Sequence, residues 1–461
     1  MSPTPSSSEP NASEPLAPGQ PIDDAAHTRP NPPDSIDRPH DPYLALRSAD
    51  YRRFALGFAP SSIGLQMMGT AISWEIYDRT QSPMALAYAG LARAVPVLCL
   101  ALPAGHAADL FNRRNILVIT QLCFALAAGA TAAASYWHAP IWVFYLLLFV
   151  SGAARSFNGP ARSSVLPQIA RGDAFPNAVT WNSGVFQVAA IIGPLLAGFM
   201  IDWPTLSGGK PQAWPVYLAT ALGCGLFALS AAGMHVPAPE RKPGPASFSF
   251  RAMIAGMSHV RREKTILAAL SLDLFAVLLG GATAMLPVYV ELILDVDPDS
   301  EGRWLGALRS SQFVGALVMS LALVHRPPFR RAGPALLWSV AGFGICMIVF
   351  GLSRNVWVSL AALFLSGGLD AISVVIRHVL VQTRTPDHVR GRVSAVNSVF
   401  IESSNQLGEF ESGSVAHAAG TIAGSKVFGA MFSVVSGGIG TILVVLGIAW
   451  MWPEIRRLRK L

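Results

Sequence analysis

Charged side chains are scarce in this 461-residue chain. Asp, Glu, Lys and Arg make up 13% of it, apolar residues make up 52%, and the mean hydropathy is +0.44. A soluble surface of this size carries about twice that share of charge, so the composition excludes a soluble multidomain enzyme. The net charge of +7 is spread over short connectors instead of one patch, and nucleic-acid binding is therefore not indicated.

Other absences narrow the chemistry further. The four cysteines lie inside apolar stretches without paired spacing, so neither a disulfide framework nor a metal site is expected. No Gly-Lys-Ser/Thr phosphate loop occurs, which argues against direct use of ATP, and no cofactor is predicted. Residues 1–42 have no apolar run and are rich in Pro, Ser and Asp, so this segment is expected to be a disordered cytoplasmic tail instead of a signal peptide.

The rest of the chain is dominated by apolar stretches of about 20 residues, the length of a helix that crosses a bilayer. We predict an all-α membrane protein with twelve transmembrane helices. The expected spans are 54–77, 84–107, 115–137, 140–158, 175–202, 214–235, 265–293, 303–324, 333–352, 355–376, 393–420 and 426–452.

The connectors between these spans alternate in charge. Those on one side hold about 23 Lys and Arg, including the basic tail 453–461, and those on the other side hold about five. The positive-inside rule then places both termini in the cytoplasm of a bacterial inner membrane. The acidic connector 295–301 would lie outside.

Two parts of the chain match at a fixed separation, which predicts two pseudo-symmetric six-helix halves. Asn182, Gly193 and Gly198 are followed 215 residues later by Asn397, Gly408 and Gly413. The predicted halves are 43–236 and 263–452, joined by a cytoplasmic linker at 237–262. The alternative is that two helices of similar composition align by chance.

The connector after the second span carries Gly105, Asp109, Arg113 and Arg114. Glycine allows close approach, aspartate accepts charge-assisted hydrogen bonds, and the arginines hold the loop at anionic lipid. This spacing resembles the cytoplasmic signature of the major facilitator superfamily. The resemblance implies that these four residues latch the two halves in one state and release them in another. A lipid-anchored loop with a capping aspartate is the alternative.

The fifth span carries Gly193, Pro194 and Gly198, similar to a motif of the antiporter branch of that superfamily. Ala189 and Ala197 stand where that motif has glycine. Trp74 and shorter matches over residues 45–450 add to this motif. On these features the chain resembles the subgroup of drug efflux proteins and enterobactin exporters. The resemblance implies export.

Several ionisable residues fall inside expected spans, where they tend to face a cavity or a partner. Glu402 and Glu409 are seven residues apart and share a helical face with Asn405, which makes that face the expected cavity lining. The alternative is that these carboxylates only pair with arginines to hold the bundle together. The candidates for coupling or cavity lining are Arg93, Asp273, Arg309, Asp370, Glu402, Asn405 and Glu409.

The combined hypothesis is a secondary transporter that exports a small amphipathic compound, such as a drug or a siderophore-like metabolite, in exchange for protons. Its expected partners are the substrate, a coupling ion and the lipid bilayer, and it is expected to be a monomer. A nutrient importer or a lipid flippase would use the same architecture. A polytopic membrane enzyme would bring a cluster of catalytic side chains at one depth, and the sequence offers none.

Overall fold

The computed structural model describes residues 41–236 and 257–458, apart from residues 259, 281, 328 and 330. Most of the predicted tail 1–42 and most of the predicted linker 237–262 lie outside the described residues, as does the chain after 458. Every regular element in the described part is helical. The longer helices are α1 (Ala49–Thr80), α2 (Pro83–Leu110), α3 (Arg113–Tyr136), α4 (Ile141–Ile169), α5 (Ala174–Asp202), α6 (Trp214–Ala232), α8 (Lys264–Leu279), α10 (Glu301–Val324), α11 (Ala332–Leu352), α12 (Val356–Arg384), α13 (Asp387–Ala423) and α14 (Lys426–Met451). The shorter ones are η2 (Ala45–Arg47), η3 (Trp203–Ser207), η4 (Ala282–Met285), α9 (Leu286–Leu292), η5 (Pro298–Ser300) and α15 (Pro453–Arg456).

Short polar side chains begin several of these helices. Asn112 accepts a hydrogen bond from the Arg114 amide at 3.0 Å, and Asn355 accepts one from the Trp357 amide at 2.9 Å. At the C-terminal end of α13, Gly424 has a φ of 65°, a left-handed conformation that glycine adopts without a Cβ penalty. Local chemistry therefore sets helix ends that hydropathy alone leaves undefined.

Ten helical segments in the described part are long and apolar enough to span a membrane. α1 and α13 are not among them, but they have 32 and 37 residues and pack beside the ten in the same bundle. The chain is an all-α membrane protein. That α1 and α13 also cross the bilayer, which would make twelve spans, stays a prediction.

The predicted seventh span at 265–293 matches the candidate span Lys264–Leu292, but its helix is interrupted. α8 ends at Leu279, and the helix resumes as α9 only after the 3₁₀ turn η4. Gly280 lies at the break, and Pro287 in the first turn of α9 has no amide hydrogen to continue a helix from the preceding turn. An apolar run thus marks a span without showing that it is unbroken.

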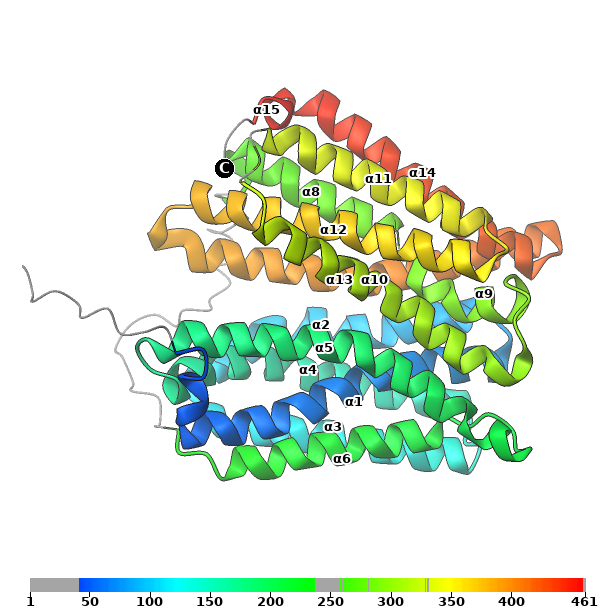
Figure 1. Cartoon of the computed structure of the whole chain (residues 1–461), viewed down its shortest axis with the longest axis horizontal. Helices are drawn as coiled ribbons and strands as arrows, with labels where there is room; N and C mark the ends of the chain where they lie inside the picture. The colour runs from blue at the N-terminus through cyan, green and yellow to red at the C-terminus, as the bar shows by residue number, and fades with distance from the viewer. Residues whose placement is uncertain are drawn as a thin grey trace, which may run out of the picture. The chain divides into compact units, whose positions relative to one another are not determined.

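The helices of the compact unit 43–461 form two bundles (Figure 1). α1–α6 pack together in one half, and α8–α14 pack together in the other. Within the halves, α5 packs on α1 and α13 packs on α8, as the predicted pseudo-symmetry requires. The halves meet mainly along two seams, α5 with α10 and α2 with α13.

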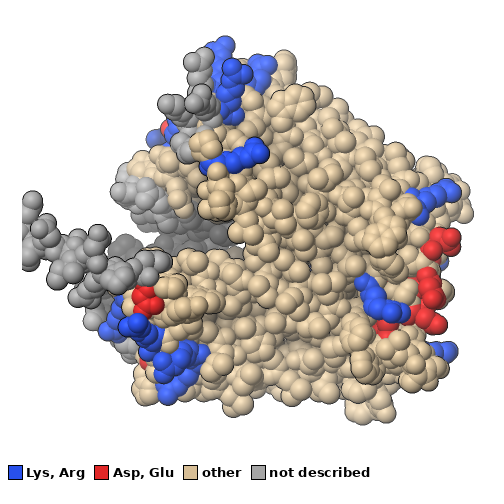
Figure 2. All heavy atoms as spheres, viewed as in Figure 1, with Lys and Arg blue, Asp and Glu red and all other residues tan. Residues whose placement is uncertain are grey.

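The two ends of this bundle differ in charge. We call the end where α1 begins and α14 finishes the basic end, and its counterpart the opposite end. In Figure 2 blue Lys and Arg side chains prevail at the basic end, on the left, whereas the opposite end, on the right, carries red carboxylates together with some Lys and Arg. The predicted charge bias between connectors therefore appears as a difference between the two ends of one bundle.

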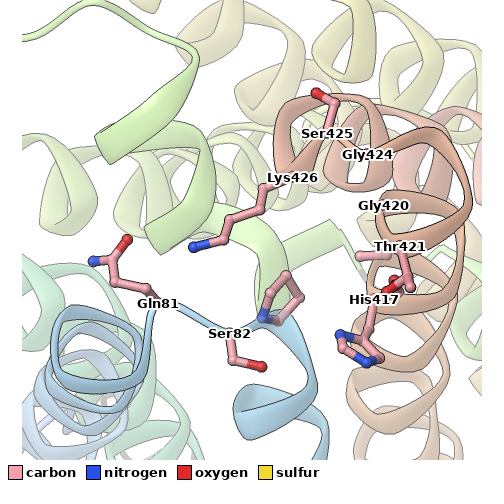
Figure 3. A pocket seen from close by; sticks show the side chains of 10 residues that line it. Gln81, Ser82, His417, Gly420, Thr421, Gly424, Ser425 and Lys426 are labelled. Carbon is pink, nitrogen blue, oxygen red and sulfur yellow. The ribbon is translucent and has the colours of Figure 1, made fainter.

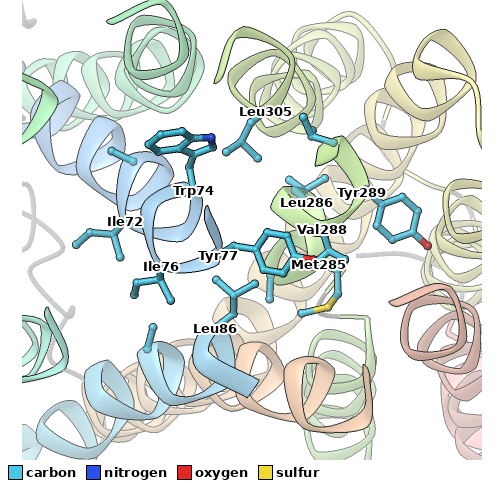
Figure 4. Packing of buried hydrophobic residues seen from close by; sticks show 14 of the residues in the cluster. Ile72, Trp74, Ile76, Tyr77, Leu86, Met285, Leu286, Val288, Tyr289 and Leu305 are labelled. Atoms are coloured by element: carbon cyan, nitrogen blue, oxygen red, sulfur yellow. The ribbon is translucent and has the colours of Figure 1, made fainter. Parts of the chain in front are cut away.

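The largest buried apolar cluster joins the two halves near the opposite end (Figure 4). Trp74 and Tyr77 of α1 lie against the segment Met285–Tyr289 and against Leu305 of α10. Tyr77 and Tyr289 are 1% and 0% exposed, so water is excluded between the halves at this level. Burial of this cluster holds the opposite end together.

Candidate functional site

The first seam brings α5 and α10 into backbone contact. A β-carbon added to Gly198 would stand 2.0 Å from the carbonyl oxygen of Gly302, and one added to Gly306 would stand 2.3 Å from that of Pro194. The Ser310 hydroxyl donates to the Ile191 carbonyl at 2.6 Å. Pro194 and Gly198 of the predicted antiporter-like motif therefore lie where the halves touch, and at Gly198 no larger residue fits without a shift of the backbone.

Asp202 closes this seam near the opposite end. Its carboxylate is 2% exposed and accepts hydrogen bonds from the backbone amides of Gly302 at 3.1 Å and Arg303 at 2.7 Å. The Arg303 guanidinium adds a third contact at 3.3 Å. A residue of one half thus caps the first turn of a helix of the other half, where the helix dipole favours a negative charge. Sequence reasoning did not single out Asp202.

The second seam, between α2 and α13, uses the same kind of contact. A β-carbon on Gly413 would stand 2.7 Å from the Pro83 carbonyl oxygen, and one on Gly90 would stand 2.9 Å from Cβ of Glu409. One turn from Gly90, Arg93 forms an ion pair with Glu409 across the halves. The two side chains are 25% and 20% exposed. Glu409 therefore pairs with an arginine of the other half.

The repeated glycines serve equivalent contacts in the two halves. Gly193 packs against Gln66 and Ile63 of α1, and Gly408 packs against Val277 and Leu278 of α8. Five residues later in each copy, Gly198 and Gly413 form the two seams described above. Glycines that share the separation of 215 residues thus make equivalent packing contacts in the two halves.

A second repeat was missed in the sequence and becomes visible through the seams. Gly90 and Arg93 are followed 216 residues later by Gly306 and Arg309, so each seam carries a Gly-x-x-Arg unit on its shorter helix. Arg309 donates to the Gly69 carbonyl of α1 at 3.3 Å and therefore also reaches across the halves. The signal lay in the spacing of arginines three residues after a glycine.

The contacts between the halves are confined to one part of the bundle. Among the described residues, the hydrogen bonds that join the two halves run from Thr205–Asp299 and Gln81–Glu291 at the opposite end only as far as Arg309 and Ser310. Toward the basic end, Figure 2 shows a notch between the two halves. In the described part of the chain, the hydrogen bonds between the halves are therefore concentrated toward the opposite end.

The predicted latch residues lie at the basic end. Gly105 and Asp109 belong to the last turns of α2, although the Asp109 side chain is outside the described residues. Arg113 donates to the Ala108 carbonyl at 3.4 Å and Arg114 to the Met234 carbonyl at 3.1 Å. Both acceptors belong to the first half, so in the described contacts these arginines do not join the halves.

The predicted face of α13 is only partly assembled. The Glu402 side chain lies outside the described residues. Asn405 is exposed and donates to the Ile401 carbonyl of its own helix at 2.9 Å. Glu409 is the member of this set that the structure brings to the seam.

Asp273 and Asp370 form a separate cluster inside the second half. Asp273 of α8 makes an ion pair with Arg377 of α12, and these side chains are 8% and 4% exposed. Asp370 lies about two helical turns before Arg377 in α12. Asp370 and Asp273 both line a cavity of about 20 Å³, enough for about one water molecule. The described partners of Asp273 and Asp370 all belong to the second half.

A larger cavity of about 250 Å³ opens at the opposite end (Figure 3). Gln81 and Ser82 lie on one side of it, and His417, Thr421 and Lys426 lie on the other. The described residues contain no group of three or more His, Cys, Asp or Glu side chains arranged to hold a metal ion.

Comparison with known proteins identifies the family to which this architecture belongs. The family model of the Major Facilitator Superfamily matches residues 54–408. The multidrug efflux pump Tap of Mycolicibacterium fortuitum is 28% identical over 76% of this chain and 85% of its own length. The enterobactin exporter EntS of Citrobacter koseri is 22% identical over 87% of this chain and 91% of its own.

Solved structures share the fold at lower identity. A bacterial homologue of the human lysosomal transporter Spinster, in an inward-facing and unoccupied conformation, superposes with a TM-score of 0.67 at 13% identity, over 91% of this chain and 98% of its own. The family match covers most of the chain, and the two six-helix bundles with their paired seams agree with it. The chain therefore belongs to the major facilitator superfamily and is a multi-pass membrane transporter.

Proposed function

We propose that this chain is a proton-coupled exporter of small amphipathic compounds that works by alternating access. The observation that carries the proposal is the closure of both seams at the opposite end beside the notch at the basic end. The positive-inside rule assigns the basic end to the cytoplasm, with both termini there and the bacterial inner membrane as the location. The structure is then the inward-open state of the cycle.

The direction of transport is argued from the relatives. Tap is named a multidrug efflux pump and EntS an enterobactin exporter, and both align with most of this chain. The Gly193–Gly198 segment, which resembles the antiporter motif, forms the α5–α10 seam. A motif that controls how closely the halves approach is well placed to control which end opens.

Proton coupling is argued from the carboxylates inside the spans. Glu409 joins the halves through Arg93, so neutralising Glu409 would weaken a contact that must break when the opposite end opens. Asp273 and Asp370 form a second acidic pair within one half. Protonation of either group would change the relative free energies of the inward-open and outward-open states. Proton coupling requires such a difference.

The experiment is efflux from intact cells that express the protein, loaded with carboxyfluorescein or Hoechst 33342, with and without the protonophore CCCP. We expect faster dye loss that CCCP abolishes, and slower loss in Glu402→Gln and Glu409→Gln. Glu454→Gln is the matched control, because Glu454 is an exposed residue in a surface pair with Lys264. Loss that CCCP leaves unchanged would refute proton coupling, and dye accumulation would identify an importer.

A further inference from the structure

Arg93 and Arg309 occupy equivalent places in the two halves but have different partners. Beside Gly90, α13 carries Glu409, which neutralises Arg93. At the equivalent place beside Gly306, α5 carries Pro194. The pseudo-symmetric copy of the carboxylate is missing, so Arg309 has no acidic partner at the position where Arg93 has one.

The described surroundings of Arg309 leave one positive charge unbalanced. Its guanidinium donates to the Gly69 carbonyl at 3.3 Å, and no carboxylate of the described residues is within ion-pair distance of it. The charges that act on it are Glu409, which attracts it, and Arg93, which repels it. Glu409 is already paired with Arg93, and in the described contacts Arg309 has no ion pair of its own. A guanidinium has five N–H donors, and most of those on Arg309 are open to a further acceptor.

The depth of Arg309 makes this unbalanced charge significant. It lies roughly 12 Å along α10 from Glu301, and Arg93 lies roughly 15 Å along α2 from Pro83. Arg309 is partly exposed, and a charged side chain at such depth faces water or a partner instead of lipid. Because the seams are closed between Arg309 and the opposite end, access to it comes from the notch at the basic end.

We propose that Arg309 is the receptor for an anionic group, a carboxylate or its equivalent, on the transported compound. That the bound compound is transported rests on the proposed function, whereas the preference for an anion rests on the charges around Arg309. A planar guanidinium binds a carboxylate with two parallel hydrogen bonds, and a low-dielectric site strengthens them. One bound anion would bring the cluster of two arginines and Glu409 to neutrality.

The site also gives Glu409 a definite role toward the ligand. The bound anion and Glu409 carry the same charge and draw on the same two arginines. They therefore compete, and removing the charge of Glu409 strengthens anion binding. A carboxylate that served only to hold the bundle together would have the reverse effect, because its loss would loosen the site for every ligand.

The test measures binding of two compounds of equal size to the purified full chain in detergent. The probes are 4-biphenylcarboxylate and the uncharged 4-biphenylcarboxamide. We expect the carboxylate to bind about tenfold tighter in the unmodified protein, a preference that Arg309→Gln abolishes while amide binding stays within about twofold. Arg354→Gln, which removes an exposed loop arginine, retains the preference. Glu409→Gln tightens carboxylate binding.

Equal binding of the two probes to the unmodified protein, or a preference that survives in Arg309→Gln, overturns the proposal. If Arg309→Gln does not fold, the Glu409→Gln protein decides, because weaker carboxylate binding there also overturns it. Binding in detergent does not depend on transport direction or on a proton gradient. A failure here leaves the export proposal standing, and a failure of the efflux experiment leaves the anion preference standing.

Discussion

Removing the Asp202 carboxylate is expected to open the opposite end. In the structure this side chain is 2% exposed and accepts three hydrogen bonds from the first turn of α10. When the halves part there, the carboxylate and the amides exchange these bonds for water. A hydrogen bond to a charged group contributes about 1.5–3 kcal/mol net, and we assign about 3 kcal/mol to the whole cap.

That value sets the size of the shift. Asp202→Ala should move the equilibrium between the two states by about 150-fold toward the outward-open state. Asp202→Asn keeps one acceptor oxygen without the charge, so about half the free energy and roughly a tenfold shift are expected. The arginine partner, Arg303, is 46% exposed and therefore contributes little to this difference.

The assay is a pair of spin-label distances in a background without the four native cysteines. One pair, L206C with I422C, spans the opposite end, and the other, R171C with H325C, spans the basic end; all four positions are exposed. In Asp202→Ala the first distance should lengthen and the second shorten. Asp299→Asn is the control, because Asp299 accepts its inter-half hydrogen bond through its backbone carbonyl. Unchanged distances in Asp202→Ala would refute the reasoning.

Three further predictions concern the seams and the buried charges. Gly198→Ala should destabilise the purified protein by about 1–3 kcal/mol, because the added methyl group clashes with the Gly302 carbonyl. Gly447→Ala is the control, because Gly447 has open space around it. Equal melting temperatures of the two variants would contradict the close contact between α5 and α10. Arg93→Gln and Glu409→Gln should each destabilise the protein by about 1–3 kcal/mol, and the double variant should lose less stability than the sum of the two. Additive losses in thermal melts would show that the two side chains do not interact. Asp370→Asn should reduce gradient-driven dye efflux at least about tenfold while the protein still melts cooperatively, and full efflux would remove Asp370 from coupling.

Hydropathy and charge predicted most of the architecture because lipid imposes length and sidedness on each helix. Spacing of glycines predicted the two halves, since Gly193 with Gly408 and Gly198 with Gly413 make equivalent close contacts. The break after Leu279 escaped prediction because a broken span is as apolar as a continuous one.

The candidate site was predicted less completely. Arg93, Arg309 and Glu409 were singled out as charges in lipid, but their partners lie 240 to 316 residues away in the other half, where no local pattern connects them. Asp202 resembled an ordinary residue at a helix end, and only the structure brings it to α10. Contacts between halves are properties of the assembled bundle.

The central claim is that both seams close the outer end of a bundle that opens to the cytoplasm. The most direct test is labelling of single cysteines with a membrane-impermeant maleimide in intact cells and in inverted vesicles. S207C should react in intact cells, and R171C and R457C should react only in inverted vesicles. Reaction of R171C or R457C in intact cells, or of S207C in inverted vesicles alone, would contradict it.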